Sequence, residues 1–161
     1  MKNTSQKSSF MTHAAMIAAI YVVLTYIFAP FSFGDVQVRI AESLTILPVF
    51  TPAAIPGLFI GCLIGNILGG AILPDIIFGS IATLIGAVFT YLLRKQSQFF
   101  CILPPIISNT IIVPLILKFA YGMNLPIAVL MFTIGMGEII SCGVLGLILY
   151  YALRRYRKVI F

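Results

Sequence analysis

The chain has 161 residues, of which 61% are hydrophobic and only 9% are charged. Soluble domains carry about a quarter charged residues, so this composition excludes a soluble domain and predicts an integral membrane protein. The formal net charge of +6 would suggest a nucleic-acid partner in a soluble chain. Here the basic residues lie mainly at the ends of apolar stretches, where they indicate membrane topology instead.

The first apolar segment and the cysteines exclude two further interpretations. Lys2 and Lys7 precede an apolar run as in a secretory signal, but that run covers residues 10–28 and is long enough to span a membrane. It is therefore predicted to be the first helix and not a cleaved peptide. The cysteines are odd in number and widely separated, so they indicate neither a disulfide framework nor a metal site. They are Cys62, Cys101 and Cys142.

Taken in chain order, the apolar runs between Pro, Gly and charged residues predict six helices in a single transmembrane domain over residues 1–161. The predicted helices cover residues 9–29, 39–50, 57–73, 75–93, 99–120 and 126–153. The second reaches only about 18 Å, whereas the hydrocarbon core of a membrane is about 30 Å thick. The other helices must therefore shelter it. The predicted fold class is an all-α integral membrane bundle with a short second helix.

The basic residues predict how this bundle is oriented. With the N-terminus in the cytoplasm, alternation through six segments places eight of the ten basic residues on the cytoplasmic side, while Arg39 and Lys118 fall elsewhere. The eight are Lys2, Lys7, Arg94, Lys95, Arg154, Arg155, Arg157 and Lys158. This asymmetry follows the positive-inside rule and predicts a multi-pass protein of the cell membrane with both termini in the cytoplasm.

Small residues form stripes on two of the predicted helices. The third helix carries a glycine every four residues, at Gly57, Gly61, Gly65 and Gly69. Such a stripe lets another backbone approach closely, and packing within the bundle is the favoured interpretation. The first helix carries two offset pairs of alanines, at Ala14, Ala15, Ala18 and Ala19. Their spacing alone leaves an internal packing seam and a docking face for another subunit equally open.

The acidic residues are informative because the chain has only four, namely Asp35, Glu42, Asp75 and Glu138. Glu138 is predicted near the middle of the membrane, where a ligand or ion role is favoured over a buried ion pair with Arg39. Glu42 follows Arg39 at i, i+3, so a local salt bridge and a ligand role remain equally open. Asp75 begins a predicted helix, and capping that helix is its simpler role.

Two amides and several aromatic residues complete the candidate site. Asn66 and Asn109 are predicted near the middle of their helices, where an interhelical hydrogen bond and a ligand contact are both open. Phe31, Phe33 and Tyr121 lie in outer connections, as interfacial anchors or as stacking partners for a planar ligand. Together these residues predict a small-molecule pocket open to the exterior.

Catalytic motifs are absent from the sequence. It contains no G-x-S-x-G, no H-E-x-x-H, no paired histidines for a metal and no phosphate loop of the G-x-x-x-x-G-K-[ST] type. His13 is the only histidine and lies far from the acids in the predicted bundle. The chain is therefore predicted not to be an enzyme, to need no cofactor, and to be unable to hydrolyse ATP itself.

Several motifs together resemble the QueT family. They are Ser32–Gly34, the stretch from Val38 to Pro48, the stretch from Ala54 to Cys62, Asn66, and Asp75–Ser80. Members of that family are substrate-binding (S) components of energy-coupling factor (ECF) transporters, proposed to take up queuosine precursors. The resemblance implies a six-helix S-component fold that binds substrate at the outer face. It also implies partners, a transmembrane T subunit and two ATP-binding-cassette ATPases, and it favours the docking interpretation of the alanine pairs.

The implied substrate, a 7-deazaguanine such as preQ1, preQ0 or queuine, offers two adjacent donors, an O6 acceptor and a planar ring. Our hypothesis is that Glu138 accepts from the donor edge, while Glu42 or Asp75 meets the cation of a 7-aminomethyl group. The assisting residues are Asn66, Asn109 and Arg39, with Phe33 or Tyr121 stacking on the ring. The alternatives are an S component for another vitamin, such as riboflavin or a thiamine-like compound, and a structural membrane subunit that binds no ligand.

Overall fold

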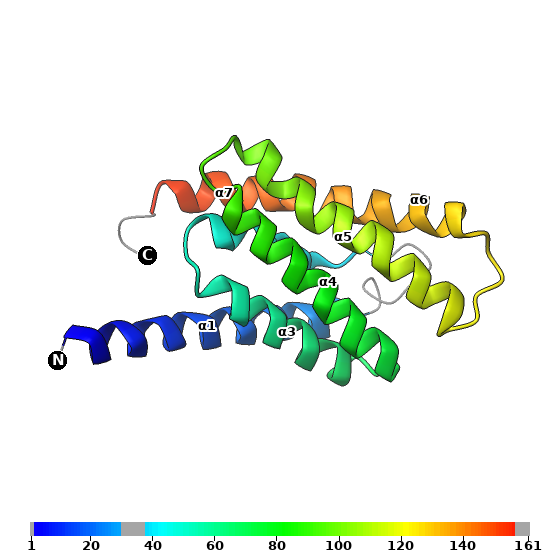
Figure 1. The fold of residues 1–161 in the computed structure, drawn as a ribbon, viewed down its shortest axis with the longest axis horizontal. Coiled ribbons are helices and arrows are strands. Elements are labelled where there is room, and N and C mark those ends of the chain that lie inside the picture. Colours follow the sequence, from blue (N-terminus) through cyan, green and yellow to red (C-terminus); the bar gives the residue numbers. More distant parts are fainter. Residues whose placement is uncertain (1, 30–37, 157–161) are drawn as a thin grey trace.

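The computed structural model describes residues 2–29 and 38–156, with side chains from residue 6 onward. These residues form a bundle of helices without strands (Figure 1). In chain order the elements are α1 (Lys2–Ile27), η1 (Ile40–Val49), α3 (Ala54–Leu68), α4 (Leu73–Leu92), α5 (Gln98–Phe119), α6 (Ile127–Glu138), η2 (Ile139–Leu145) and α7 (Gly146–Arg154). The last three are continuous, so the described residues contain six helices, and the predicted all-α membrane bundle is confirmed.

Four helical segments are long and apolar enough to cross a membrane. They are Gln6–Ile27, Leu73–Leu92, Gln98–Phe119 and Ile127–Arg154. The helix predicted over residues 57–73 is shorter than expected: α3 begins at Ala54 and ends at Leu68. Its 15 residues reach about 22 Å, so it does not cross the hydrocarbon core alone.

A glycine pair ends α3 before the predicted boundary. Gly70 adopts φ of 75°, which favours glycine, and its N–H donates to the backbone oxygen of Ile67 at 3.2 Å. The N–H of Ala71 donates to the oxygen of Asn66 at 3.0 Å, which completes a Schellman motif. The helix therefore stops where its last carbonyl groups find these donors, although the sequence remains apolar to residue 73.

The short helix η1 lies at the centre of the bundle. All of its residues from Ala41 to Val49 are buried, and it packs against α1, α4, η2 and α7. It is a 3₁₀-helix of 10 residues, which is long for that geometry. This burial agrees with the prediction that the neighbouring helices shelter the short helix.

Close backbone contacts join α1 to α3. A Cβ at Gly57 would lie 2.7 Å from the backbone oxygen of Ala14, and a Cβ at Gly61 would lie 2.7 Å from the Cβ of Tyr21. Real Cβ atoms do not approach so closely, so these two positions require glycine. These contacts agree with the prediction that the glycine stripe serves packing within the bundle.

A proline-containing seam joins α4 to α5. Gly86 of α4 faces the Cα of Pro105, which a Cβ at residue 86 would approach to 2.7 Å. Pro105 has no N–H to donate to the oxygen of Cys101 four residues earlier. The hydroxyl of Thr90 donates to that oxygen instead, at 2.9 Å. Neighbouring α4 thus makes room for the proline and satisfies the carbonyl that it leaves without a helical partner.

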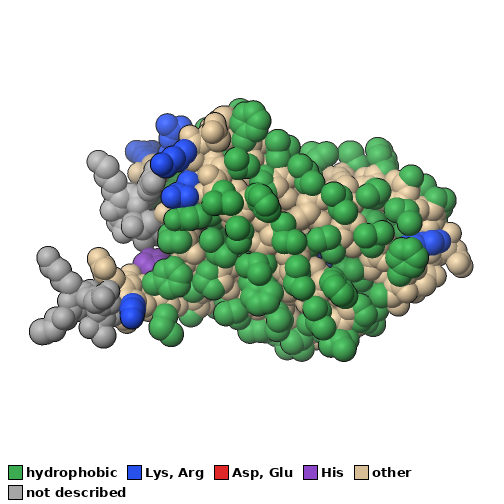
Figure 2. Space-filling model, in the orientation of Figure 1, with side chains coloured by type: hydrophobic (Ala, Val, Ile, Leu, Met, Phe, Trp, Pro, Cys, Tyr) green, Lys and Arg blue, Asp and Glu red, His purple; other side chains and the backbone are tan. Residues whose placement is uncertain are grey.

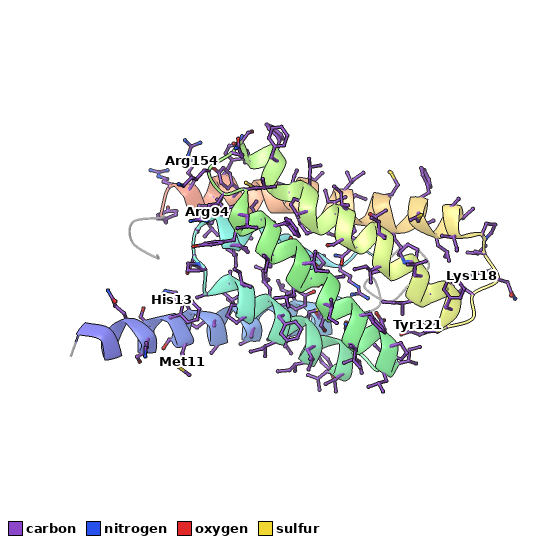
Figure 3. All side chains as sticks on the ribbon, in the orientation of Figure 1. Met11, His13, Arg94, Lys118, Tyr121 and Arg154 are labelled. Atoms are coloured by element: carbon purple, nitrogen blue, oxygen red, sulfur yellow. The ribbon has the colours of Figure 1, made fainter. Side chains whose placement is uncertain are left out.

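The two ends of the bundle differ in charge. α1 begins and α7 ends at the same end (Figure 1), and Arg94 and Arg154 lie there as well (Figure 3). Lys118 and Tyr121 lie at the opposite end (Figure 3). Between the ends, the face shown in Figure 2 is mainly hydrophobic and displays no acidic side chain. The end that contains Lys118 and Tyr121 is called the Tyr121 end below.

Candidate functional site

Glu42 is held by two hydroxyl groups at the centre of the bundle. It lies in η1 and is fully buried. Its Oε1 accepts hydrogen bonds from the phenol of Tyr21 in α1 and from the hydroxyl of Thr83 in α4, the latter at 3.2 Å. Its Oε2 is buried and has no hydrogen-bond partner among the described residues. One carboxylate oxygen is therefore fixed in place, and the other is left as an acceptor.

Glu138 has partners on both carboxylate oxygens. It ends α6 and is 3% exposed. The side-chain amide of Asn109, in α5, donates to Oε1 at 3.1 Å, and the thiol of Cys142 donates to Oε2 at 3.1 Å. Cys142 lies in η2, a π-helical segment that follows Glu138 directly. Insertions of this kind inside α-helices often mark functional sites, and here the insertion directly follows the buried acid.

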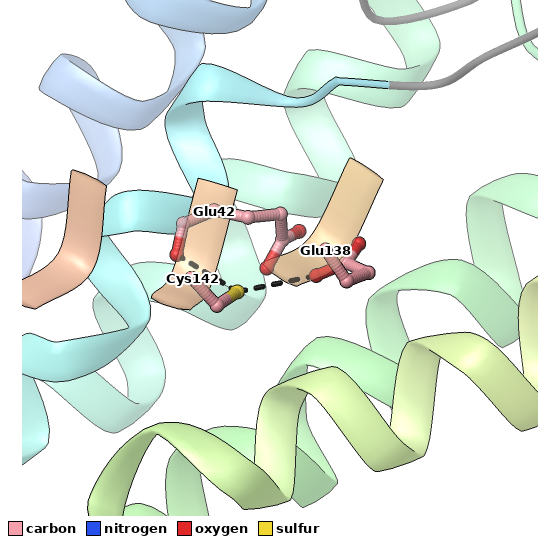
Figure 4. A group of neighbouring side chains, drawn as sticks. All are labelled: Glu42, Glu138 and Cys142. Carbon is pink, nitrogen blue, oxygen red and sulfur yellow. Dashed lines mark hydrogen bonds between the residues drawn. The ribbon is translucent and has the colours of Figure 1, made fainter. Parts of the chain in front are cut away.

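Glu42, Glu138 and Cys142 meet in one group, called the acid cluster here (Figure 4). A carboxylate oxygen of each glutamate and the sulfur of Cys142 lie within 4.8 Å of one another, and all three residues are buried. The hydroxyl of Thr45 also donates to the sulfur, at 3.4 Å. Residues nearly 100 positions apart in sequence are thus brought together between η1 and the last membrane span.

The acid cluster is suited to a positive charge. Oxygens of the two carboxylates lie within 4.8 Å of each other in a low-dielectric interior, so both would attract a cation placed between them. Carboxylate oxygens and a cysteine sulfur at these distances would also fit a metal ion. The sequence predicted no metal site, because its cysteines are odd in number and widely separated and it has no paired histidines. The geometry therefore admits a metal ion or a ligand ammonium group.

A second polar group, called the outer network here, consists of Arg39, Asp75 and Tyr121. The guanidinium of Arg39 pairs with Oδ2 of Asp75 across 3.9 Å, and both side chains are buried. The phenol of Tyr121 donates to the same oxygen at 3.1 Å and accepts from the N–H of Ile72 at 3.3 Å. Burial raises the pKa of Tyr121, so the phenol keeps its proton at neutral pH. A charge pair and a tyrosine thus join the residue before η1, the first turn of α4 and the loop after α5.

The predicted capping role of Asp75 is wrong. Asp75 lies in the first turn of α4, but Ile72 is the N-cap and no side chain caps this helix. Its carboxylate turns to Arg39 and Tyr121 instead, which leaves Oδ1 buried without a hydrogen-bond partner among the described residues. An ion pair across the bundle has replaced the local interaction that the position in sequence suggested.

Both predicted amides make interhelical hydrogen bonds. Asn66 of α3 donates to the backbone oxygen of Asp75 in α4, at 3.4 Å, and Asn109 holds Glu138 as described above. Gly79 lies beside the first contact, because a Cβ there would approach Oδ1 of Asp75 to 3.0 Å. Asn66 thus lies beside the outer network, and Asn109 lies beside the acid cluster. The structure divides the predicted site residues into these two groups.

Three residues in or beside the acid cluster were not identified from the sequence. Cys142 was set aside because the cysteines suggested no shared site, although it follows Glu138 by one helical turn, a spacing that places both on one face. Tyr21 and Thr83 carry no such signal, because each approaches Glu42 only through tertiary packing. The predicted stacking residue Phe33, together with Phe31 and Asp35, lies outside the described residues.

The alanines of α1 divide between two surfaces. Ala18 is buried and Ala14 is half-buried, and both face the glycines of α3. Ala15 and Ala19 are exposed. All four line an apolar groove of about 700 Å³ along α1 and α3. Packing within the bundle therefore accounts for part of the stripe, and its other part lies on the surface.

Comparison with known proteins identifies the family of this chain. A family model described as QueT transporter matches residues 11–155. A protein of Lactococcus lactis subsp. cremoris (strain MG1363), named Queuosine precursor transporter QueT, is 36% identical over 73 residues. That match covers 44% of this chain and 43% of the relative, less than half of either protein. No solved structure matches significantly. The match over most of the chain shows that it belongs to the QueT transporter family, a family of transporters and not of enzymes.

Proposed function

We propose that this chain is the membrane-embedded substrate-binding subunit of an ECF-type importer, and that it captures a queuosine precursor at the outer face. One observation carries the proposal: the two glutamates Glu42 and Glu138 are both buried and lie side by side in the middle of a membrane protein. Ionisable groups are costly in that environment and usually mark a ligand or ion pathway. The name of the Lactococcus lactis relative supports a queuosine precursor as the ligand.

The chemistry of the acid cluster suits a 7-deazaguanine. The N1–H and 2-amino groups of the base are adjacent donors that one carboxylate accepts together. Glu138 takes this role in the proposal, with Asn109 orienting its carboxylate at 3.1 Å. Arg39 and Asn66 assist from the side of the outer network, and Tyr121 or Phe33 stacks on the ring. The ring would enter from the Tyr121 end of the bundle, opposite Arg94 and Arg154 (Figure 3).

The distribution of charge supports an orientation for the whole chain. Arg94 and Arg154 lie where α1 begins and α7 ends, so the positive-inside rule places that end in the cytoplasm with both termini. Residues 1–161 then act as one transmembrane domain. The Tyr121 end faces the exterior.

Transport requires partners in this proposal, because the sequence lacks a phosphate loop for ATP. The partners are a transmembrane T subunit and two ATP-binding-cassette ATPases. Ala15 and Ala19 are exposed and line the groove along α1 and α3, which suits close packing of another membrane helix. Ala14 and Ala18 line the same groove and complete the docking surface.

A ligand panel on the purified subunit tests the proposal. Thermal unfolding is measured with 7-aminomethyl-7-deazaguanine, 7-cyano-7-deazaguanine and queuine, and with riboflavin and thiamine as comparison ligands. A saturable rise in Tm with at least one 7-deazaguanine, and none with the two vitamins, is expected. Stabilisation by a vitamin alone would identify another S component. No stabilisation by any ligand would favour a structural subunit.

A further inference from the structure

We propose that Glu42 is the residue that binds the substituent at position 7 of the ligand, and that it selects a positively charged form of that substituent. The inference rests on the proposed function and deepens it. It chooses between Glu42 and Asp75, which the sequence left open, and it chooses among precursors that share the same base. The ligand class is a 7-deazaguanine with an ammonium group on its substituent.

Oδ1 of Asp75 is also buried without a hydrogen-bond partner among the described residues, but Asp75 is the poorer candidate because Arg39 already balances its charge. Arg39 lies 3.9 Å from its Oδ2, and the Tyr121 phenol donates to the same oxygen at 3.1 Å. A ligand cation at Asp75 would have to compete with a guanidinium supplied by the protein. In a buried setting an existing ion pair of this kind is costly to break.

The hydrogen bonds of the two glutamates assign different roles to them. Both oxygens of Glu138 accept bonds from the protein, one from Asn109 and one from Cys142. Glu42 uses only Oε1, which Tyr21 and Thr83 hold from two different helices, and its Oε2 has no partner among the described residues. Its side chain extends toward Glu138 and Cys142 (Figure 4). Glu42 therefore presents a fixed, buried acceptor to the interior of the acid cluster.

A charged substituent matches this acceptor, and a neutral one does not. An ammonium group offers three donors and a positive charge to Oε2 of Glu42, and the nearby carboxylate of Glu138, within 4.8 Å, favours a positive charge at this place. A nitrile offers only an acceptor, which would face the lone pairs of Glu42. Hydrogen bonds with a charged partner are stronger than neutral ones, and leaving such an acceptor unpaired in the interior is costly.

The test compares ligands first and variants second. Affinities of the purified wild-type subunit in lipid nanodiscs are measured for 7-aminomethyl-7-deazaguanine, for its neutral 7-hydroxymethyl analogue and for the 7-cyano compound. The wild-type protein is expected to bind the aminomethyl compound at least about 10-fold more tightly than either neutral ligand. Equal affinity for charged and neutral ligands would overturn the inference without any variant.

The Glu42→Gln variant then locates the selectivity. It is expected to weaken binding of the aminomethyl compound about 10- to 100-fold and not to weaken binding of the cyano compound, because the uncharged Gln amide can donate to the nitrile. The matched control, Tyr21→Phe, removes a hydrogen bond to Glu42 but keeps the charge, so it should retain the preference for the ammonium ligand. Equal losses for both ligands in Glu42→Gln would show that Glu42 does not contact the substituent.

Two further outcomes separate this inference from its alternatives. If the wild-type protein binds none of the 7-deazaguanines, the proposed function fails and the inference fails with it. If Zn²⁺ or Mn²⁺ alone raises the Tm, and Glu42→Gln abolishes that effect, the acid cluster holds a metal ion and the inference is overturned. Binding of the charged ligand that persists unchanged in EDTA supports the ammonium assignment.

Discussion

The acid cluster and the outer network both contain buried carboxylates, but they balance charge differently. In the outer network, Asp75 has a guanidinium at 3.9 Å and a phenol at 3.1 Å, so the protein supplies its own cation. In the acid cluster, Glu42 and Glu138 have only hydroxyl, amide and thiol donors among the hydrogen bonds described. Buried acids therefore suggest a ligand most strongly where two of them lie close together and the protein provides only uncharged hydrogen-bond donors. There the ligand can supply the missing positive charge.

The largest expected effect comes from removing the cation of the outer network. Arg39→Gln leaves Asp75 as a buried charge without its guanidinium, so we expect the free energy of unfolding to fall by about 3 to 5 kcal/mol. Thermal and denaturant unfolding of the purified subunit measure the loss. Adding Asp75→Asn to this variant should recover part of the stability, because the uncompensated charge is removed. If Arg39→Gln unfolds like the wild-type protein, the ion pair has no structural role.

The next effect is on binding and not on stability. Glu138→Gln replaces a carboxylate that accepts from the shared guanine edge, so we expect affinity for every 7-deazaguanine to fall by about 100-fold, or about 2.7 kcal/mol. Isothermal titration measures this change, with Arg154→Gln at the opposite end of the bundle as the control. Unchanged affinity in Glu138→Gln would remove this residue from the site. If Glu138→Gln lost affinity only for the ammonium ligand, Glu138 would bind the substituent and Glu42 would bind the guanine edge.

A smaller effect is expected at the seam that supports the acid cluster. A Cβ added at Gly61 would lie 2.7 Å from the Cβ of Tyr21, whose phenol holds Glu42. Gly61→Ala should therefore cost about 2 kcal/mol of stability by forcing α1 away from α3. The matched change Ala19→Leu adds bulk to the exposed part of α1 and should leave unfolding of the isolated subunit nearly unchanged while reducing its copurification with a T subunit. Equal destabilisation by both changes would show that Ala19 also packs inside the bundle.

The smallest expected effect is at the hydroxyl of Tyr121. Tyr121→Phe keeps the ring but removes the hydrogen bond to Asp75, so we expect a loss of about 1 kcal/mol in stability. Ligand affinity should change little if the ring stacks on the base, whereas Tyr121→Ala should also weaken binding. Differential scanning calorimetry and titration separate these contributions. Loss of binding in Tyr121→Phe would place the hydroxyl itself in the ligand site.

The sequence predicted the bundle well because apolar run length and charge position are local properties. The centrally buried short helix followed from its length, which is too small to cross a membrane. The end of α3 was wrong because the Gly69–Gly70 pair was treated as part of an apolar run and not as a helix terminus. The sequence also contained no sign of the π-helical turn after Glu138.

The candidate site was predicted less completely than the fold. Glu42, Glu138 and Asp75 could be identified because acidic residues are rare in so apolar a chain and are costly inside a membrane unless they have a function. Their partners depend on tertiary packing: Arg39 lies three residues from Glu42 in the chain, yet it pairs with Asp75 of α4. Tyr21 reaches Glu42 only because the glycines of α3 bring α1 close to the centre of the bundle. Such contacts have no local signature.

The central claim is that the buried glutamates bind a 7-deazaguanine. Titration of 7-aminomethyl-7-deazaguanine into the wild-type subunit and into the Glu42→Gln/Glu138→Gln variant tests it most directly, with both proteins first shown to be folded by thermal unfolding. We predict saturable binding to the wild-type protein and none detectable in the double variant. Equal binding by the two proteins would contradict the account, because the ligand would then lie outside the acid cluster.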